Sequence, residues 1–120
     1  MEAPVTTRIL IVDDEPLIAL TAVDMVEALG YEAIEAHSGA EALEILGNGQ
    51  KIDLLITDHS MPGMSGADLV REARLIKPEL AVMVSTGYSE LPEGFEEGTQ
   101  FLSKPYSELD LFAKIEAAIR

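Results

Sequence analysis

Short, continuous apolar runs recur along the chain, and each is bounded by polar residues. Three of these runs are rich in β-branched and aliphatic residues and cover positions 9–12, 54–56 and 81–84. Runs of this length are typical of strands that are buried on both faces of a sheet. A more polar stretch at 31–36 predicts an edge strand, and positions 100–103 form a fifth, short candidate. The sequence therefore predicts five strands.

Helical spacing fills the stretches between the predicted strands. Pro16 suits the first turn of a helix, and Gly30 suits its C-terminal end. Between them, one predicted apolar face carries Ile18, Ala22, Met25, Val26 and Leu29. Three later helices are each expected to open at a serine that is followed three residues on by an acid, which can satisfy free backbone N–H groups. These pairs are Ser38 with Glu41, Ser65 with Asp68, and Ser107 with Asp110.

Strand and helix patterns alternate five times, which indicates a parallel sheet with helices on both faces. The fourth helix is expected to be short or irregular, because only residues 87–98 separate the fourth and fifth strands and Pro92 and Gly94 interrupt them. Right-handed crossovers bring the carboxyl ends of all the strands to one edge. Ligands of such sheets bind in the crevice beyond that edge.

Composition narrows the class of protein. The 120 residues fit one domain, with a core from about residue 8 and residues 1–7 as an N-terminal extension. Eight basic and 22 acidic residues give a net charge of −14, which argues against direct nucleic-acid binding. The chain has no cysteine, no apolar run of membrane-spanning length and no signal-peptide pattern, so we expect a cytoplasmic protein without a membrane contact.

Polar residues with a common chemistry stand at the predicted strand ends. The first strand ends at Asp13 and Asp14, the third at Asp58, the fourth at Thr86 and the fifth at Lys104. Two carboxylates about 4 Å apart repel by roughly 4 kcal/mol at an effective dielectric constant near 20. One lysine does not offset three carboxylates, whereas Mg²⁺ with its preference for oxygen ligands does. In the alternative interpretation, Asp13 and Asp14 only cap the first helix.

With these residues in place, the chain resembles the receiver domains of two-component response regulators. The resemblance extends over residues 8–120 and rests on the segments ILIVDDEP, HSGAEAL, DLLITDHSMPGMSG, VMVSTGY and FLSKPY. It implies an α/β fold, namely a flavodoxin-like, doubly wound, five-stranded parallel sheet of order 2-1-3-4-5 with five helices. Both single-domain receivers and receivers attached to kinases carry similar T-G-Y turns and short fourth helices.

The resemblance also implies a phosphorylation site and a metal site. The aspartate that matches Asp58 is the phosphorylation site of the family. Residues matching Asp14 and Asp58 bind Mg²⁺ directly, or Mn²⁺ in its place, together with the backbone carbonyl of Ser60. The residue matching Asp13 usually acts on the metal through water.

Further roles follow from the same resemblance. Residues matching Thr86 and Lys104 contact the phosphoryl oxygens, and Thr86 with Phe101 matches a switch pair. The bond between Lys104 and Pro105 is commonly cis in the family. His59 should point to the opposite face from Asp58 and is predicted to be a surface residue rather than a catalyst. His37 is likewise predicted to be a solvated loop residue.

The implied function is a bacterial phosphoacceptor that regulates a protein target through its surface between the fourth strand and the last helix. It would not be an enzyme beyond Mg²⁺-dependent self-phosphorylation and slow autodephosphorylation. The donor would be a histidine kinase or a histidine phosphotransfer protein, and the chain itself a monomer or a weak dimer. We expect a docking patch for the donor, formed by Leu17, Leu20, Thr21, Pro105 and Tyr106.

Two other functions were weighed against the phosphoacceptor, and residues 87–98 suggest how it would be regulated. A phosphohydrolase resembling the haloacid dehalogenases would need its nucleophile in an Asp-x-Asp arrangement after the first strand, where this chain has Asp-Asp-Glu at 13–15. A phosphorylation-independent interaction module would have no reason to gather repelling carboxylates. The segment 87–98, which holds four glutamates and no base, is expected to be mobile and to gain order on phosphorylation.

Overall fold

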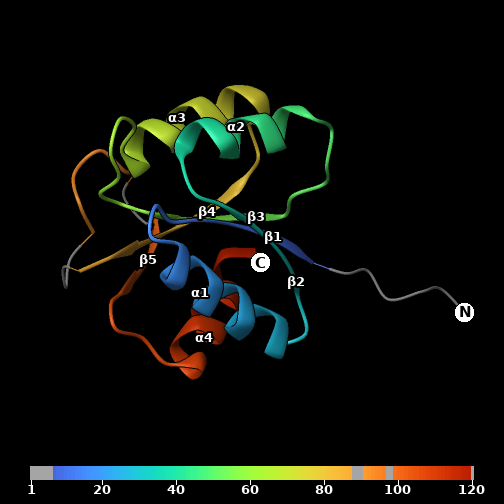
Figure 1. Cartoon of the computed structure of the whole chain (residues 1–120), viewed down its shortest axis with the longest axis vertical. Coiled ribbons are helices and arrows are strands. Elements are labelled where there is room, and N and C mark those ends of the chain that lie inside the picture. The colour runs from blue at the N-terminus through green and yellow to red at the C-terminus, as the bar shows by residue number, and fades with distance from the viewer. Residues whose placement is uncertain (1–6, 88–90, 97–98, 120) are drawn as a thin grey trace, which may run out of the picture.

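The structure is a computed structural model that describes residues 7–87, 91–96 and 99–119. Strands and helices alternate along the chain up to β4, and β4 is followed by another strand (Figure 1). The elements are β1 (Arg8–Val12), α1 (Pro16–Ala28), β2 (Glu32–Ala36), α2 (Gly39–Gly47), β3 (Leu54–Asp58), α3 (Gly66–Ile76), β4 (Ala81–Thr86), β5 (Gln100–Ser103) and α4 (Glu108–Ile119).

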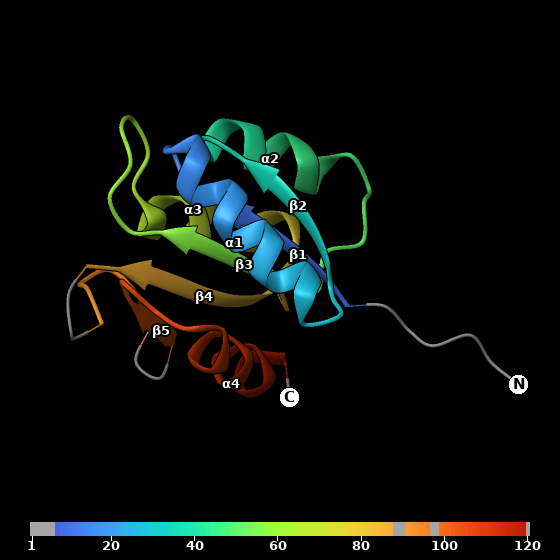
Figure 2. The same ribbon diagram turned by 60° about the horizontal axis from the view of Figure 1, so that its bottom comes forward.

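The five strands form one parallel sheet in the order β2-β1-β3-β4-β5, as predicted (Figure 2). The register aligns the carboxyl ends of the inner strands. Val12 pairs with Thr57, Asp58 pairs with Ser85, and Thr86 pairs with Ser103. The residues that follow these positions therefore meet at one edge of the sheet, which is the edge where the sequence predicts a site.

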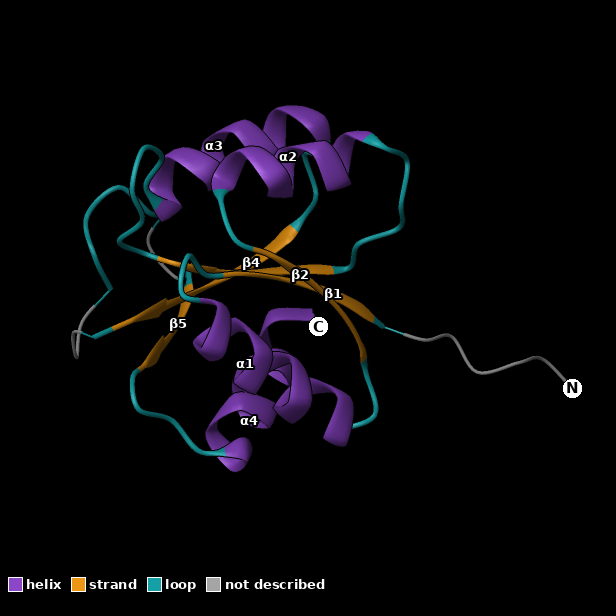
Figure 3. Ribbon diagram, viewed as in Figure 1, coloured by secondary structure: helices purple, strands orange, loops and turns teal. Residues whose placement is uncertain are grey.

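Helices cover both faces of the sheet, with α2 and α3 on one face and α1 and α4 on the other (Figure 3). Side chains alternate between the two faces along each strand. On β3, Leu55 enters the cluster under α2 and α3, while Leu54 and Ile56 enter the cluster under α1 and α4. Apolar cores thus pack on both faces of the sheet and fix the positions of its strand ends.

Serine caps open three of the helices, as predicted. The hydroxyl of Ser38 accepts a hydrogen bond of 3.1 Å from the backbone N–H of Glu41, and the hydroxyl of Ser65 accepts one from Asp68 at the same distance. Ser107 and Asp110 form a reciprocal capping box. The Asp110 N–H donates to the serine hydroxyl at 3.1 Å, and the Ser107 N–H donates to the Asp110 carboxylate at 3.2 Å.

The buried face of α1 differs from the predicted one. Ala19, Ala22 and Val26 are its buried residues, whereas Ile18 and Met25, predicted to lie in the core, are only half-buried. The buried positions follow an i, i+3, i+7 spacing, so the helix face that α1 turns to the sheet is centred on Ala19 and Val26 rather than on Ile18 and Met25. The displaced side chain of Ile18 lies instead in a surface groove.

The fourth of the five expected helices is not found in the described residues. Of the stretch between β4 and β5, residues 91–96 are irregular with a turn, and Gly94 adopts a φ of +96°. Pro92 removes a backbone donor and Gly94 breaks the helical geometry, so these residues oppose a helix. The expected mobility of this segment also concerns residues 88–90 and 97–98, which lie outside the described residues, as do residues 1–6 of the expected extension.

Within the described part of the chain, no helix combines the length and the apolar character needed to cross a membrane.

Candidate functional site

Three carboxylates converge at the carboxyl edge of the sheet. Asp13 and Asp14 follow β1, and Asp58 ends β3. One oxygen from each lies within 4.8 Å of the others. Asp13 is only 4% exposed, and the other two are half-buried. The register of β1 against β3 therefore brings Asp58 to the adjacent pair Asp13 and Asp14, although Asp58 lies 44 residues after Asp14 along the chain.

Lys104 supplies the positive charge at this cluster. Its Nζ donates a hydrogen bond of 3.1 Å to Oδ1 of Asp58 and one of 3.3 Å to Oδ2 of Asp13. Its backbone N–H donates to the carbonyl of Thr86 at 2.7 Å, which extends the pairing of β4 with β5. The Lys104–Pro105 peptide bond is cis, as expected.

The charges at the site alter one another's protonation. Burial raises the pKa of the Asp58 carboxyl above its ordinary value, and the charge of Asp13 adds to this effect, while Lys104 and the His59 N–H partly offset it. Burial alone would lower the pKa of the Lys104 ammonium, but Asp58 and Asp13 together outweigh it and raise that pKa. The lysine therefore stays charged, and the folded chain disfavours the ionised form of Asp58.

A backbone N–H also binds the Asp58 carboxylate. The His59 N–H donates to Oδ1 of Asp58 at 3.0 Å and also lies 3.1 Å from the carbonyl oxygen of Ser85. The N–H of Gly66, at the start of α3, donates to the carbonyl of His59 at 2.9 Å. At the end of β4, the side chain of Thr86 is only 2% exposed. The site thus combines a half-buried acid, a charged lysine and a buried hydroxyl residue.

The residues at this edge fit a hard divalent cation. Three carboxylates whose oxygens lie within 4.8 Å of one another repel by roughly 3 kcal/mol or more per pair at an effective dielectric constant of about 20. Lys104 is the one basic side chain paired with them among the described residues, so negative charge remains in excess. Oxygen ligands and excess negative charge are what Mg²⁺ requires. The predicted fourth ligand, the carbonyl of Ser60, stays a prediction.

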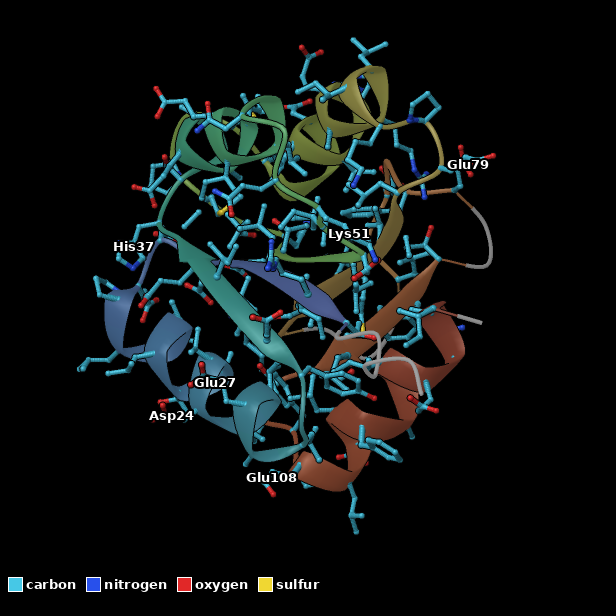
Figure 4. All side chains as sticks on the ribbon, turned by 90° about the vertical axis from the view of Figure 1, so that its right-hand side faces the viewer. Asp24, Glu27, His37, Lys51, Glu79 and Glu108 are labelled. Carbon is cyan, nitrogen blue, oxygen red and sulfur yellow. The ribbon has the colours of Figure 1, made fainter. Side chains whose placement is uncertain are left out.

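The two histidines take different positions. The ring of His59 lies 6.0 Å from that of Phe95, which packs on the core under α2 and α3, and His59 is half-buried rather than the surface residue expected. His37 is exposed at the end of β2 (Figure 4). It contacts the carboxylate of Glu35 at 2.8 Å, which agrees with a solvated residue.

A groove of about 450 Å³ opens next to the site, between α1 and the loop that follows β5. Of the predicted docking residues, Thr21, Pro105 and Tyr106 line it, while Leu17 and Leu20 stand on α1 with 79% and 48% of their surface exposed. The remaining lining consists of Ile18, Ala22, Met25 and Lys104. Because Lys104 belongs to both, the groove is continuous with the carboxylate cluster.

The predicted switch residue Phe101 lies on β5 and is half-buried. The ammonium of Lys114, on α4, stands 5.6 Å from the centre of its ring, within the range of a cation–π contact. Thr86 and Phe101 thus lie on neighbouring strands, with Phe101 paired in register with Val84.

Two features of the site were not found from the sequence. Gly66 packs so closely against the end of β3 that a Cβ there would collide with the carbonyl oxygen of Asp58. Phe95, from the segment before β5, covers His59. Gly66 follows a serine cap directly, and a glycine at a first helical position is a signal for close packing. Phe95 had no comparable signal, because its contact spans an irregular segment.

Comparison with known proteins agrees with this geometry. The profile of the family described as "Response regulator receiver domain" matches residues 9–116. The sensor kinase CckA of Brucella abortus is 37% identical over 109 residues, which cover 85% of this chain and 11% of the kinase. The transcriptional regulatory protein CpxR of Escherichia coli is 34% identical over 116 residues, which cover 94% of this chain and 49% of the regulator. The chain thus spans half or less of these relatives.

Solved structures show the same likeness over the whole fold. A response regulator receiver domain protein from Clostridium thermocellum superposes with a TM-score of 0.85 at 36% identity, and 94% of each chain is covered. The receiver domain from the hybrid histidine kinase CckA superposes with a TM-score of 0.80 at 38% identity, covering 94% of this chain and 99% of that one.

Proposed function

This chain belongs to the response regulator receiver domain family, and we propose that it accepts a phosphoryl group on Asp58 as part of a two-component or phosphorelay system. The observation that carries the proposal is the contact of Lys104 with both Asp58 and Asp13 inside the three-carboxylate cluster. A scaffold would gain nothing from this concentration of repelling charge. A phosphoryl acceptor needs it, because its chemistry depends on charge and position.

The proposed reaction uses the chain's own residues in simple roles. A carboxylate oxygen of Asp58 attacks phosphorus, the bond from phosphorus to the donor nitrogen breaks, and the donor imidazole leaves with that electron pair. Lys104 is placed to bind a phosphoryl oxygen, since its ammonium already contacts the acceptor carboxylate at 3.1 Å. The hydroxyl of Thr86 would donate to a second phosphoryl oxygen. No histidine base is needed, because a carboxylate has no proton to lose when it attacks phosphorus.

The proposed metal ligands are Asp13, Asp14, Asp58 and the carbonyl of Ser60, with Asp13 acting through water. A Mg²⁺ ion, or Mn²⁺ in its place, would supply positive charge that stabilises the equatorial phosphoryl oxygens when bound there. Without such a charge, the acidic cluster would repel an incoming phosphate. The three carboxylates within 4.8 Å of one another support this assignment.

The proposed output is a change in the surface between β4 and α4. Once Thr86 moves towards the phosphoryl group, the chain that follows β4 must move with it, and the half-buried ring of Phe101 has room to change its position. Lys114 over that ring would be displaced or drawn along. A downstream protein that binds this surface would then distinguish the two states.

The proposed donor is a histidine kinase or a histidine phosphotransfer protein in the cytoplasm. The groove beside Lys104 and the exposed Leu17 and Leu20 form an apolar surface at the mouth of the site. Exposed acidic side chains stand on the two helices of this face, Asp24 and Glu27 on α1 and Glu108 on α4 (Figure 4). We therefore expect a helical partner with an apolar strip and a basic rim.

The test is incubation with Mg²⁺ and acetyl phosphate, followed by intact mass. One added phosphoryl group that appears with Mg²⁺ and not with a chelator supports the proposal. No addition, with or without metal, supports instead the phosphorylation-independent interaction module. Rapid turnover of generic phosphomonoesters would favour the phosphohydrolase, although the Asp-Asp-Glu sequence at 13–15 argues against it.

A further inference from the structure

An aromatic contact joins the segment before β5 to the residue next to the phosphoacceptor. The rings of His59 and Phe95 have centroids 6.0 Å apart and planes tilted by 58°. This geometry is typical of a favourable edge-to-face pair. Both residues are half-buried, and Phe95 also packs against the apolar core beneath α2 and α3. The contact therefore connects the β4–β5 connection with the end of β3.

Three features hold Phe95 in this position. Gly94 turns the chain with a φ of +96° and approaches α3 so closely that a Cβ there would lie 2.9 Å from the methyl of Ala67. Glu96 forms an ion pair of 3.6 Å with Arg74 on α3. The carbonyl of Glu96 also accepts hydrogen bonds from the backbone and the hydroxyl of Thr99 at 3.1 and 2.6 Å. Residues 94–96 are thus seated on α3 rather than extended into solvent.

The backbone of His59 is part of the acceptor's own support. Its N–H donates to Oδ1 of Asp58 at 3.0 Å, and its carbonyl accepts from the Gly66 N–H at 2.9 Å. The imidazole is the side chain of the same residue, so a ring fixed by Phe95 restricts the rotation of this backbone. The carboxylate oxygen that Lys104 contacts is the same Oδ1.

We propose that Phe95 is a positioning residue for the phosphoacceptor: by packing on His59 it fixes the backbone N–H that orients the Asp58 carboxylate. The inference rests on the proposed function only in so far as Asp58 is the acceptor. It explains why a segment too short and too broken for a helix still carries an aromatic residue inside the fold. Removing the ring takes away this contact, so that the His59 backbone holds the Asp58 carboxylate less firmly in its productive orientation.

The experiment compares Phe95→Ala with two matched variants. Phe95→Tyr keeps the ring, and Phe112→Ala removes an equal ring that is 41% exposed on α4, on the other face of the sheet. The first readout is hydrogen exchange of single backbone amides in the free protein. The second readout is the rate of labelling by acetyl phosphate with Mg²⁺.

We expect Phe95→Ala to speed exchange of the His59 amide by about tenfold and to slow labelling by about fivefold, since small displacements of a reacting group cost rate. Exchange at the core of β1 should not change, and neither Phe95→Tyr nor Phe112→Ala should affect either readout. His59→Ala should slow labelling as much as Phe95→Ala, and the double variant no further.

Two results of the exchange experiment overturn the inference. One is an unchanged His59 amide in Phe95→Ala; the other is equal acceleration of exchange at every core amide, which is a loss of global stability. Labelling of Phe95→Ala at the parent rate overturns it as well, while the proposed function stands. If the parent itself is not labelled, the proposed function fails, and the amide exchange still decides whether Phe95 restrains His59.

Discussion

Lys104 donates a 3.1 Å hydrogen bond to Asp58, although 46 residues separate the two along the chain. The contact exists because β4 lies between their strands and pairs with both, which places the ends of β3 and β5 at one edge. The same ammonium also contacts Asp13 at 3.3 Å. One cation thus links two repelling carboxylates, and both the stability of the fold and the proposed chemistry depend on it.

Lys104→Ala should destabilise the metal-free protein by about 1–2 kcal/mol. Breaking a buried ion pair costs about 3–5 kcal/mol, and the 26% exposure of the lysine side chain reduces that cost. Lys51→Ala is the matched control, because that lysine is 64% exposed and its pair with Asp53 at 3.9 Å contributes little. Urea denaturation measures both. Equal stability of the two variants would contradict the role given to Lys104.

Asp58→Asn should stabilise the metal-free protein by about 1 kcal/mol, or about 4 °C in Tm. The substitution keeps the shape and removes one of three repelling charges. The sign agrees with the raised pKa of Asp58: the folded chain disfavours the ionised carboxyl, so near neutral pH its charge lowers stability.

Mg²⁺ should act in the opposite sense on the same pair of proteins. At a hundred times its Kd it should stabilise the parent by about 2.7 kcal/mol, because it binds the assembled site and scarcely the unfolded chain. Asp58→Asn should gain clearly less. Thermal melting with and without Mg²⁺ measures this, and an equal shift for both proteins would remove Asp58 from the ligand set.

Gly66→Ala should destabilise the protein by about 1–3 kcal/mol and slow labelling by acetyl phosphate. The added methyl collides with the carbonyl oxygen of Asp58, and either that backbone or the start of α3 must shift. Gly47→Ala, in the last turn of α2 with open space around it, is the control and should gain up to about 1 kcal/mol. Chemical denaturation measures the stability of both variants. If Gly66→Ala is as stable as the parent, Gly66 packs less tightly against Asp58 than the structure indicates.

Leu17→Asp should slow phosphoryl transfer from a phosphohistidine protein by about tenfold and leave labelling by acetyl phosphate unchanged. The leucine is 79% exposed beside the groove, so a charge there affects a docked apolar partner and not the fold. Leu75→Asp, at a leucine 75% exposed on α3, is the control and should change neither rate. Equal slowing with both donors would reject a docking role for Leu17.

Much of the fold follows from local signals in the sequence. Short apolar runs bounded by polar residues predict the strands, and three serine caps predict the helix starts, because both signals depend on a few neighbouring residues. The buried face of α1 was harder to predict. Leu17, Ile18, Ala19 and Leu20 are consecutive apolar residues, so their spacing alone does not say which of them enters the core. In the structure Ala19 is the fully buried one, while Leu17 and Leu20 are exposed.

The site also has parts that the sequence predicts and a part that it does not. Strand ends predict that Asp13, Asp14, Asp58, Thr86 and Lys104 share one edge, because a parallel sheet permits no other arrangement. The contact of Phe95 with His59 has no periodic signal, since it depends on how an irregular segment folds back on α3. The roles of the site residues in phosphorylation stay predictions.

The most direct test of the account is to locate the phosphoryl group. The parent is labelled with acetyl phosphate and Mg²⁺, the aspartyl phosphate is reduced with borohydride, and the modified peptide is sequenced by mass spectrometry. We predict that the reduced residue is Asp58 alone and that Asp58→Asn takes up no phosphoryl group. Labelling at Asp13 or Asp14, or full labelling of Asp58→Asn, would contradict the assignment of Asp58 as the phosphoacceptor.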